Sequence, residues 1–236
     1  MTELPRSWIW PVVVVTVLLA GLWHWMHLRS VEDALLRSWP DELEHSAQLM
    51  QFALSVGRPA YDAHCASCHG TSLTGNRALG APSLSDSTWL YGKGNIADIE
   101  TTILYGIRSG HPKSHNVTDM PAEGRTHQLS EAEIGDVVEY LLTLSRHSHD
   151  EGAAQRGRAL FYDKGNCFDC HGSDASGNSD YGAPPLLGPN WLYGGDRLTL
   201  YRTVYSGRHG RCPAWINTLT PVQIRALAVY LYARSH

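Results

Sequence analysis

The first feature of the hydrophobic pattern is an apolar run from Trp8 to Met26, which contains no Asp, Glu, Lys or Arg. A helix needs about 20 apolar residues to cross a bilayer, and tryptophans at both ends of the run match the aromatic belts of membrane interfaces. The residues after Leu22 offer no small-residue cleavage site, which disfavours a removed signal peptide. We therefore predict a retained transmembrane anchor within residues 1–28.

The pattern of residues 29–56 changes from polar to amphipathic and is interrupted at Pro40. After the proline, apolar positions at helical spacing predict a short helix that turns one face inward, namely Leu49, Phe52 and Ala53. A plain linker fits the same residues equally well. In either case this segment is a juxtamembrane connector.

Two later segments carry strong helix-start signals. Ser130 is followed by Glu133, and Thr220 by Gln223, and both pairs have the form of a capping box. The apolar residues that follow each box lie on one helix face, and no strand-type alternation persists elsewhere. We therefore predict an all-α fold.

The chain after the connector contains one series of motifs twice. Each copy has Cys-x-x-Cys-His-Gly, then Gly-Asn, Gly-Ala-Pro and Trp-Leu-Tyr-Gly, with the same spacing from the cysteine pair to the tryptophan. This period is longer than that of solenoid repeats, so it indicates a tandem duplication of a domain. The predicted organisation is an anchor (1–28), a connector (29–56) and two domains (57–146 and 147–236).

Composition excludes several classes of protein. Hydrophobic residues make up 43% of the 236 residues and charged residues 18%, which excludes a disordered chain. The formal net charge of −4 gives no electrostatic footprint for nucleic acid. Five cysteines, four of them in two close pairs, do not fit a disulfide framework.

The cysteine pairs match the attachment signature of c-type haem, Cys-x-x-Cys-His. The two thiols are spaced to form thioether bonds with the haem vinyl groups, and the adjacent histidine meets the iron. A zinc site made of the four cysteines leaves the histidines unexplained, and a thioredoxin-like motif needs a βαβ context that is absent. We predict two covalent haem c groups, on residues Cys65, Cys68, His69, Cys167, Cys170 and His171.

The sixth iron ligands distinguish the two copies. In the first copy Met120 fits this role, while the aligned position in the second copy is Cys212. A thiolate donates electron density to iron, whereas methionine raises the reduction potential, and the nearby Arg208 and Arg211 are expected to hold the thiolate form. His209 is a second candidate, and a vacant site with Cys212 as a small buried side chain is a third.

Taken together, the residues resemble subunit III of cbb3-type cytochrome c oxidase over about residues 45–234. The resemblance rests on the two haem motifs, on the Trp-Leu-Tyr-Gly segments that begin at Trp89 and Trp191, and on Asp119-Met-Pro-Ala and Pro213-Ala-Trp. It implies that His69 and Met120 ligate one haem and His171 the other. The family pattern has methionine at position 212, so Cys212 departs from it.

The resemblance also implies a function. Such a subunit passes electrons from a cytochrome c or a quinol-cytochrome c reductase to the catalytic subunit of a haem-copper oxidase, beside a mono-haem subunit, and does not itself reduce O₂. Haem attachment of this kind takes place outside the cytoplasmic membrane. We therefore expect a single-pass protein of the bacterial inner membrane, with both haem domains on the periplasmic side.

An enzyme is the alternative. In thiosulfate dehydrogenases a His/Cys-ligated catalytic haem is paired with a His/Met-ligated accepting haem, which the difference between Met120 and Cys212 would fit. The closing helices and the Trp-Leu-Tyr-Gly segments favour the oxidase subunit.

Overall fold

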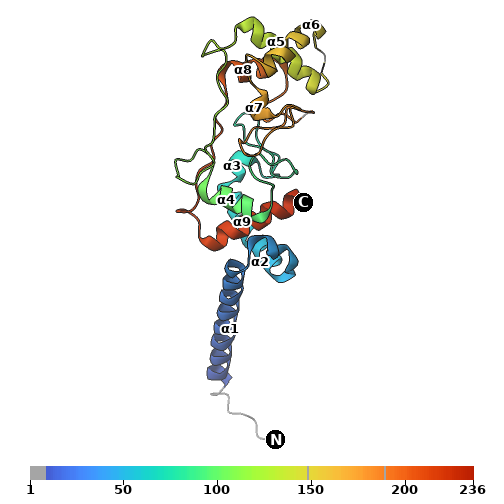
Figure 1. Ribbon diagram of the computed structural model, residues 1–236. Helices are drawn as coiled ribbons and strands as arrows, with labels where there is room; N and C mark the ends of the chain where they lie inside the picture. Colours follow the sequence, from blue (N-terminus) through green and yellow to red (C-terminus); the bar gives the residue numbers. More distant parts are fainter. Residues whose placement is uncertain (1–8, 148, 189) are drawn as a thin grey trace.

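The structure, a computed structural model, describes residues 9–147, 149–188 and 190–236. These residues form helices and isolated β-bridges, with no strand of a sheet among them, so the predicted all-α fold is confirmed. Figure 1 shows one long helix leading into two stacked helical units. The elements are α1 (Ile9–Arg37), η2 (Pro40–His45), α2 (Ala47–His64), α3 (Ala66–His69), α4 (Ile96–Tyr105), α5 (Glu131–Leu144), α6 (Glu151–Tyr162), α7 (Phe168–His171), α8 (Arg197–Ser206) and α9 (Pro221–Ser235).

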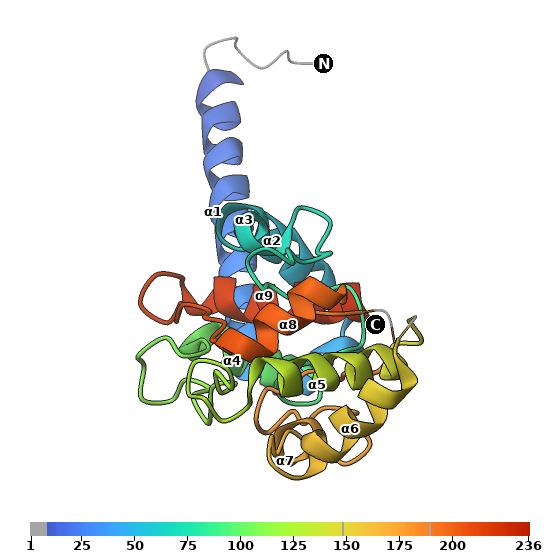
Figure 2. The ribbon, with the colours of Figure 1, turned by 90° about the horizontal axis from the view of Figure 1, so that it is seen from above.

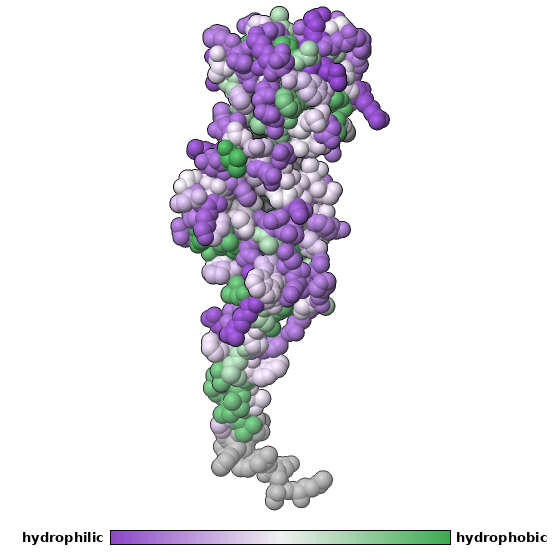
Figure 3. Space-filling model, in the orientation of Figure 1, coloured by the Kyte–Doolittle hydropathy of each residue, from purple (hydrophilic) through white to green (hydrophobic). Residues whose placement is uncertain are grey.

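Helix α1 covers residues 9–28 of the predicted anchor and continues beyond them to Arg37. Its length and composition suffice to cross a membrane, and its most apolar stretch buries no residue against the rest of the protein. In Figure 3 this stretch is the hydrophobic band next to the grey residues. Trp8, one member of the expected aromatic belt, lies outside the described residues.

The far end of α1 is held by the helical body. Val31 and Leu35 are buried, and Arg225 from α9 donates to the carbonyls of Leu35 (3.1 Å) and Ser38 (2.9 Å). The last carbonyls of a helix have no partner within the helix, so this arginine satisfies two polar groups that burial would otherwise leave unpaired. Its Nε also donates to Glu100 at 2.8 Å. The C-terminal end of α1 therefore continues into the hydrophobic core that contains α9.

The connector is more helical than the sequence indicates. Pro40 begins η2, and the expected short helix is the 18-residue α2, which runs through the predicted domain boundary at position 57. Its inward face is the predicted one, since Ala53 is buried and Leu49 and Phe52 pack against the core.

The two helical units are not the two sequence copies. Helix α2 of the first copy packs against α9 of the second, whereas α5, which closes the first copy, packs against α6, which opens the second. Figure 1 shows α5, α6 and α8 together and α9 apart from them, and Figure 2 gives the view from above, in which α8 overlaps α9. The copies have thus exchanged their closing helices. Unit A contains α2, α3, α4 and α9, and unit B contains α5, α6, α7 and α8.

Each unit has its own hydrophobic core. In unit A the core joins α2, α4 and α9 through fully buried side chains such as Tyr61, Ile96 and Leu227. In unit B it joins α5, α6 and α8 through Ile134, Phe161 and Leu200. Both α5 and α9 begin at the predicted capping boxes.

Two glycines allow the exchanged helices to approach closely. Gly57 in α2 faces the backbone of Ala226 in α9, and Gly157 in α6 faces that of Asp136 in α5. A Cβ atom at either glycine would overlap a carbonyl group of the facing helix. Glycine in a helix interior lowers helix stability by about 1 kcal/mol relative to alanine. At these two positions the close helix crossing, which only glycine permits, offsets that loss.

We expect Gly157→Val to destabilise the haem-loaded chain in detergent by about 1–3 kcal/mol or more, because the added side chain forces α5 and α6 apart. Thermal unfolding followed by circular dichroism measures the effect. The matched control is Gly135→Ala on α5, where a Cβ meets nothing within 4 Å and helix propensity predicts a gain of up to about 1 kcal/mol. Equal stability of Gly157→Val and the parent chain would contradict the close crossing.

Candidate haem sites

The cysteine motifs lie on single helical turns, α3 and α7. The amide of His69 donates to the carbonyl of Cys65 and that of His171 to Cys167, both at 3.0 Å. Residues three and four apart share one face of a helix. Each turn therefore presents two thiols and an imidazole on one side, which is the arrangement that covalent haem attachment requires.

Each motif histidine is oriented by a proline carbonyl. His69 Nδ1 lies 2.9 Å from the carbonyl oxygen of Pro82, and His171 Nδ1 lies 3.0 Å from that of Pro184. A carbonyl can only accept, so the ring proton is on Nδ1 and the Nε2 lone pair is free to bind a metal. Burial lowers the pKa of both histidines, which favours this neutral form.

The repeated Gly-Ala-Pro segment supplies these carbonyls. Paired backbone hydrogen bonds between Asn76 and Ala81, and between Asn178 and Ala183, close each loop just before the proline. The repeat is visible in the sequence, but the role of its proline as histidine acceptor is not.

The motifs open into one continuous cavity of about 780 Å³. Both histidines, Trp89 and Trp191 line it. The indole Nε1 atoms of both tryptophans are buried and lack a hydrogen-bond partner among the described residues. Each nitrogen packs against a glycine, Gly94 or Gly195, and is closed off from the cavity. Each motif brings two thiols and an imidazole to this largely apolar cavity, so the residues present suit two covalent haem groups.

The two candidate sixth ligands lie in exchanged positions. Cys212 is next to the first haem motif: burial, followed by the neighbouring Cys68, raises the pKa of its thiol to about 11. Burial, followed by Cys212 itself, raises the pKa of Cys65 to about 12. Met120 packs instead against the core of unit B, as does Cys167 of the second haem motif.

This placement differs from the pairing within each copy that the sequence implies, His69 with Met120 and His171 with Cys212. The physical reason is the exchange of the closing helices, since each helix brings the ligand segment before it into the other unit. Those segments pass side by side between the units: Ile107 and Cys212 exchange two hydrogen bonds of 2.9 Å, and the Met120 amide donates to the Arg208 carbonyl at 3.2 Å.

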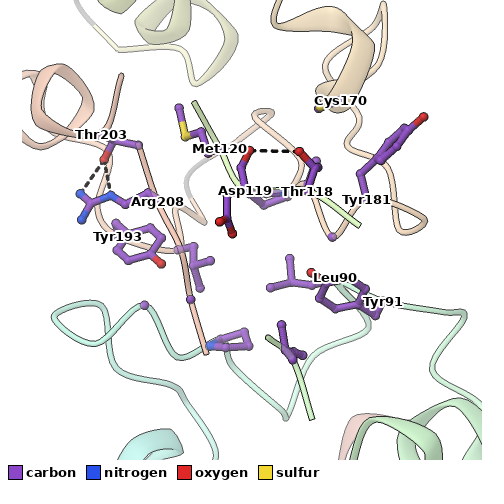
Figure 4. Close-up of a pocket in the computed structure, with 18 of the residues that line it drawn as sticks. Leu90, Tyr91, Thr118, Asp119, Met120, Cys170, Tyr181, Tyr193, Thr203 and Arg208 are labelled. Atoms are coloured by element: carbon purple, nitrogen blue, oxygen red, sulfur yellow. Dashed lines mark hydrogen bonds between the residues drawn. The ribbon is translucent and has the colours of Figure 1, made fainter. Parts of the chain in front are cut away.

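The contacts of Arg208 lie away from the Cys212 thiol. The Arg208 guanidinium donates to Thr203 Oγ1 at 3.0 and 2.6 Å and lies over the ring of Tyr193, as Figure 4 shows.

The candidate His209 and a further histidine, His115, lie outside the haem cavity. His209 is largely exposed, with its Nδ1 at 3.7 Å from an oxygen of Asp119, and belongs to a smaller recess that Arg108 and Arg211 also line. His115 stacks on Tyr91 at 4.4 Å between ring centroids. These contacts give the histidines structural partners.

One pair of contacts was missed by sequence reasoning. The ring of Tyr193 lies against Gly80, and that of Tyr91 against Gly182, so each copy places a tyrosine on a glycine of the other. The signal was present, because both Trp-Leu-Tyr-Gly and Gly-Ala-Pro repeat, but nothing in a repeat tells whether its members meet within one copy or across two.

Sequence models of two families match the chain: cytochrome c over residues 55–145, and cytochrome c oxidase, cbb3-type, subunit III over residues 152–231. The cbb3-type cytochrome c oxidase subunit CcoP of Azospirillum brasilense is 41% identical over 198 residues, covering 81% of this chain and 65% of the relative. Subunit FixP of Azorhizobium caulinodans is 39% identical over 207 residues, covering 87% and 68%. The chain thus spans about two thirds of the length of these relatives.

We expect Trp89→Phe to destabilise the haem-loaded chain by about 0.5–3 kcal/mol, because the smaller ring leaves a gap beside Gly94 in the wall of the haem cavity. Thermal unfolding of the full chain in detergent measures the loss. Trp39→Phe is the control, since Trp39 is 75% exposed and should change stability by no more than about 0.5 kcal/mol. Unchanged or increased stability of Trp89→Phe would show that the indole ring does not pack closely in the wall of the haem cavity.

Proposed function

Because the chain belongs to the CcoP/FixP family of cbb3-type cytochrome c oxidase subunits, we propose that it is a di-haem electron carrier of a membrane-bound terminal oxidase. It holds two covalent haem c groups and accepts electrons from a cytochrome c or a quinol-cytochrome c reductase. It passes them on to the catalytic subunit, where O₂ is reduced.

The observation that carries this proposal is the shared cavity. Both haem motifs line one continuous space of about 780 Å³, so two macrocycles within it are neighbours. An electron carrier needs this proximity and a docking face for each partner, whereas an enzyme needs in addition a substrate site beside one iron.

We further propose the ligand sets that the exchanged geometry supports. The haem on Cys65 and Cys68 takes His69 and Cys212, and the haem on Cys167 and Cys170 takes His171 and Met120. The supporting contacts are the thiol of Cys212 beside Cys68 and the packing of Met120 and Cys167 against the same core of unit B.

The chain's own residues prepare both sites for electron transfer. Each iron accepts and releases one electron when haem is bound. Pro82 and Pro184 hold the histidine rings by their Nδ1 protons, and the apolar walls exclude water. Methionine raises a haem potential relative to thiolate, so the haem of unit A should have the lower potential.

The location follows from the anchor and from the chemistry of attachment. Helix α1 spans the bacterial inner membrane once, and both units lie on the periplasmic side, where covalent attachment of haem takes place. Unit A is the membrane-proximal one because α1 ends within its core. The partners are the catalytic and mono-haem subunits of the oxidase and the cytochrome c donor.

A second function is favoured by one observation, the cysteine beside the first haem motif. A His/Cys-ligated haem in unit A and a His/Met-ligated haem in unit B would match the division into catalytic and accepting haems in thiosulfate dehydrogenases. Reduction of the isolated protein by thiosulfate, abolished by Cys212→Met, would establish this activity in place of the carrier function.

The ligand sets are tested by removing one haem at a time. In the oxidised full chain we expect near-infrared magnetic circular dichroism and EPR to show one thiolate-ligated and one methionine-ligated low-spin haem. Cys65→Ala combined with Cys68→Ala should abolish the thiolate signature and leave the methionine one, and Cys167→Ala with Cys170→Ala should do the reverse.

The same experiment discriminates against pairing within each copy, which would make the thiolate signature disappear together with the second haem. Cys212→Met is the complementary variant, and it should raise the lower potential within the range of roughly 0.8 V that axial ligands span. Co-purification with a haem-copper catalytic subunit tests the partner. A parent chain that binds no such subunit would argue against the oxidase function.

A further inference from the structure

Arg108 contacts both of the segments that carry a candidate sixth ligand. Its Nη2 donates to the carbonyl of Thr118 at 2.9 Å, and its Nη1 donates to that of Gly210 at 2.7 Å. Thr118 lies two residues before Met120, and Gly210 two residues before Cys212. The Arg108 guanidinium therefore binds, in each ligand segment, the carbonyl that lies two residues before the candidate ligand.

The third side of the guanidinium faces a carboxylate. Arg108 Nε forms an ion pair with Asp119, the residue before Met120, without a hydrogen bond between them. The Arg108 side chain is only 14% exposed, and it lines both the haem cavity and the adjoining recess. Charge-assisted hydrogen bonds in such an environment are about twice as strong as neutral ones.

The backbone of Arg108 is also unusual. Its φ angle is +47°, in the left-handed region that side chains other than glycine rarely adopt. Such a conformation persists where the surrounding contacts impose it, and it is concentrated at functional sites. Arg208, at the matching position of the second copy, is not among the described residues with positive φ.

Arg208 occupies the matching position of the second copy, but its side chain does not bridge the two ligand segments. Its guanidinium binds Thr203 of its own copy and lies 4.0 Å from the ring centroid of Tyr193. None of these side-chain bonds reaches a ligand segment. The two arginines are equivalent in the repeat, but of their two side chains only that of Arg108 bonds both ligand segments.

We propose that Arg108 is a positioning residue shared by both haems, holding the segments of Met120 and Cys212 in place at once. The proposal rests on the ligand sets of the proposed function. The planar fork of the guanidinium provides donors in fixed directions, which a lysine ammonium does not. If either hydrogen bond breaks, the Arg108 side chain becomes free to move, and its hydrogen bond to the other segment weakens. Displacement of one sixth ligand therefore weakens the binding of the other ligand.

The test uses the haem-loaded full chain in detergent, with Arg108→Lys and Arg108→Gln compared with Arg208→Lys and Arg208→Gln. The readouts are the near-infrared signatures of the thiolate- and methionine-ligated haems and the two midpoint potentials. Arg108→Lys keeps the charge but not the fork, so a fraction of both haems should lose the sixth-ligand signature. Both Arg208 variants should retain both signatures.

Arg108→Gln should in addition lower both midpoint potentials, because it leaves the Asp119 carboxylate without its cation. The proposal is overturned if Arg108→Lys leaves either haem's signature intact, or if the Arg208 variants cause the same losses. Failure of the ligand sets is recognised separately, in the parent chain, by the absence of the thiolate or the methionine signature before any arginine is changed.

A measurement on the parent chain covers the case in which the Arg108 variants do not accumulate with haem. On heating, the two sixth-ligand signatures should disappear in a single transition at one temperature, because one side chain holds both segments. Two separate transitions would overturn the proposal.

Discussion

The contact on which the structure depends is the close crossing of helices from different copies, α2 on α9 and α5 on α6. Gly57 and Gly157 permit it, since a Cβ atom at either position would overlap a facing carbonyl group. The crossing determines which residues form each core, and through the segments before α5 and α9 it determines which candidate ligand enters which unit. Helix packing thus decides which haem motif each candidate ligand segment can reach.

The features that sequence predicted are those with local signals. The haem motifs, the capping boxes at Ser130 and Thr220, and the long apolar helix each depend on residues a few positions apart, and the structure has all of them. The exchange could not be predicted in this way. Helices α5 and α9 have the same caps and similar apolar faces, so the pattern identifies a closing helix without identifying its partner.

In the candidate site, too, the residues with a local sequence signal were predicted and the long-range contacts were not. The spacing of the cysteines and histidines predicts haem attachment. The hydrogen bonds that hold the site together, in contrast, are accepted by backbone carbonyls elsewhere in the chain. Pro82 and Pro184 accept from the histidines, and Thr118 and Gly210 accept from Arg108. Every residue has a backbone carbonyl, so the sequence does not indicate which carbonyls accept these hydrogen bonds. Only the folded chain shows which ones are used.

The exchange also has a consequence for the order in which the protein is assembled. A chain is synthesised from its N-terminus, so Cys65, Cys68 and His69 emerge well before Cys212, which lies near the end of the second copy. A haem delivered to the first motif during export would meet its covalent partners and one histidine long before the segment that completes its pocket. Thioether bonds suit such an interval, because they retain the haem while the rest of the chain is still being made.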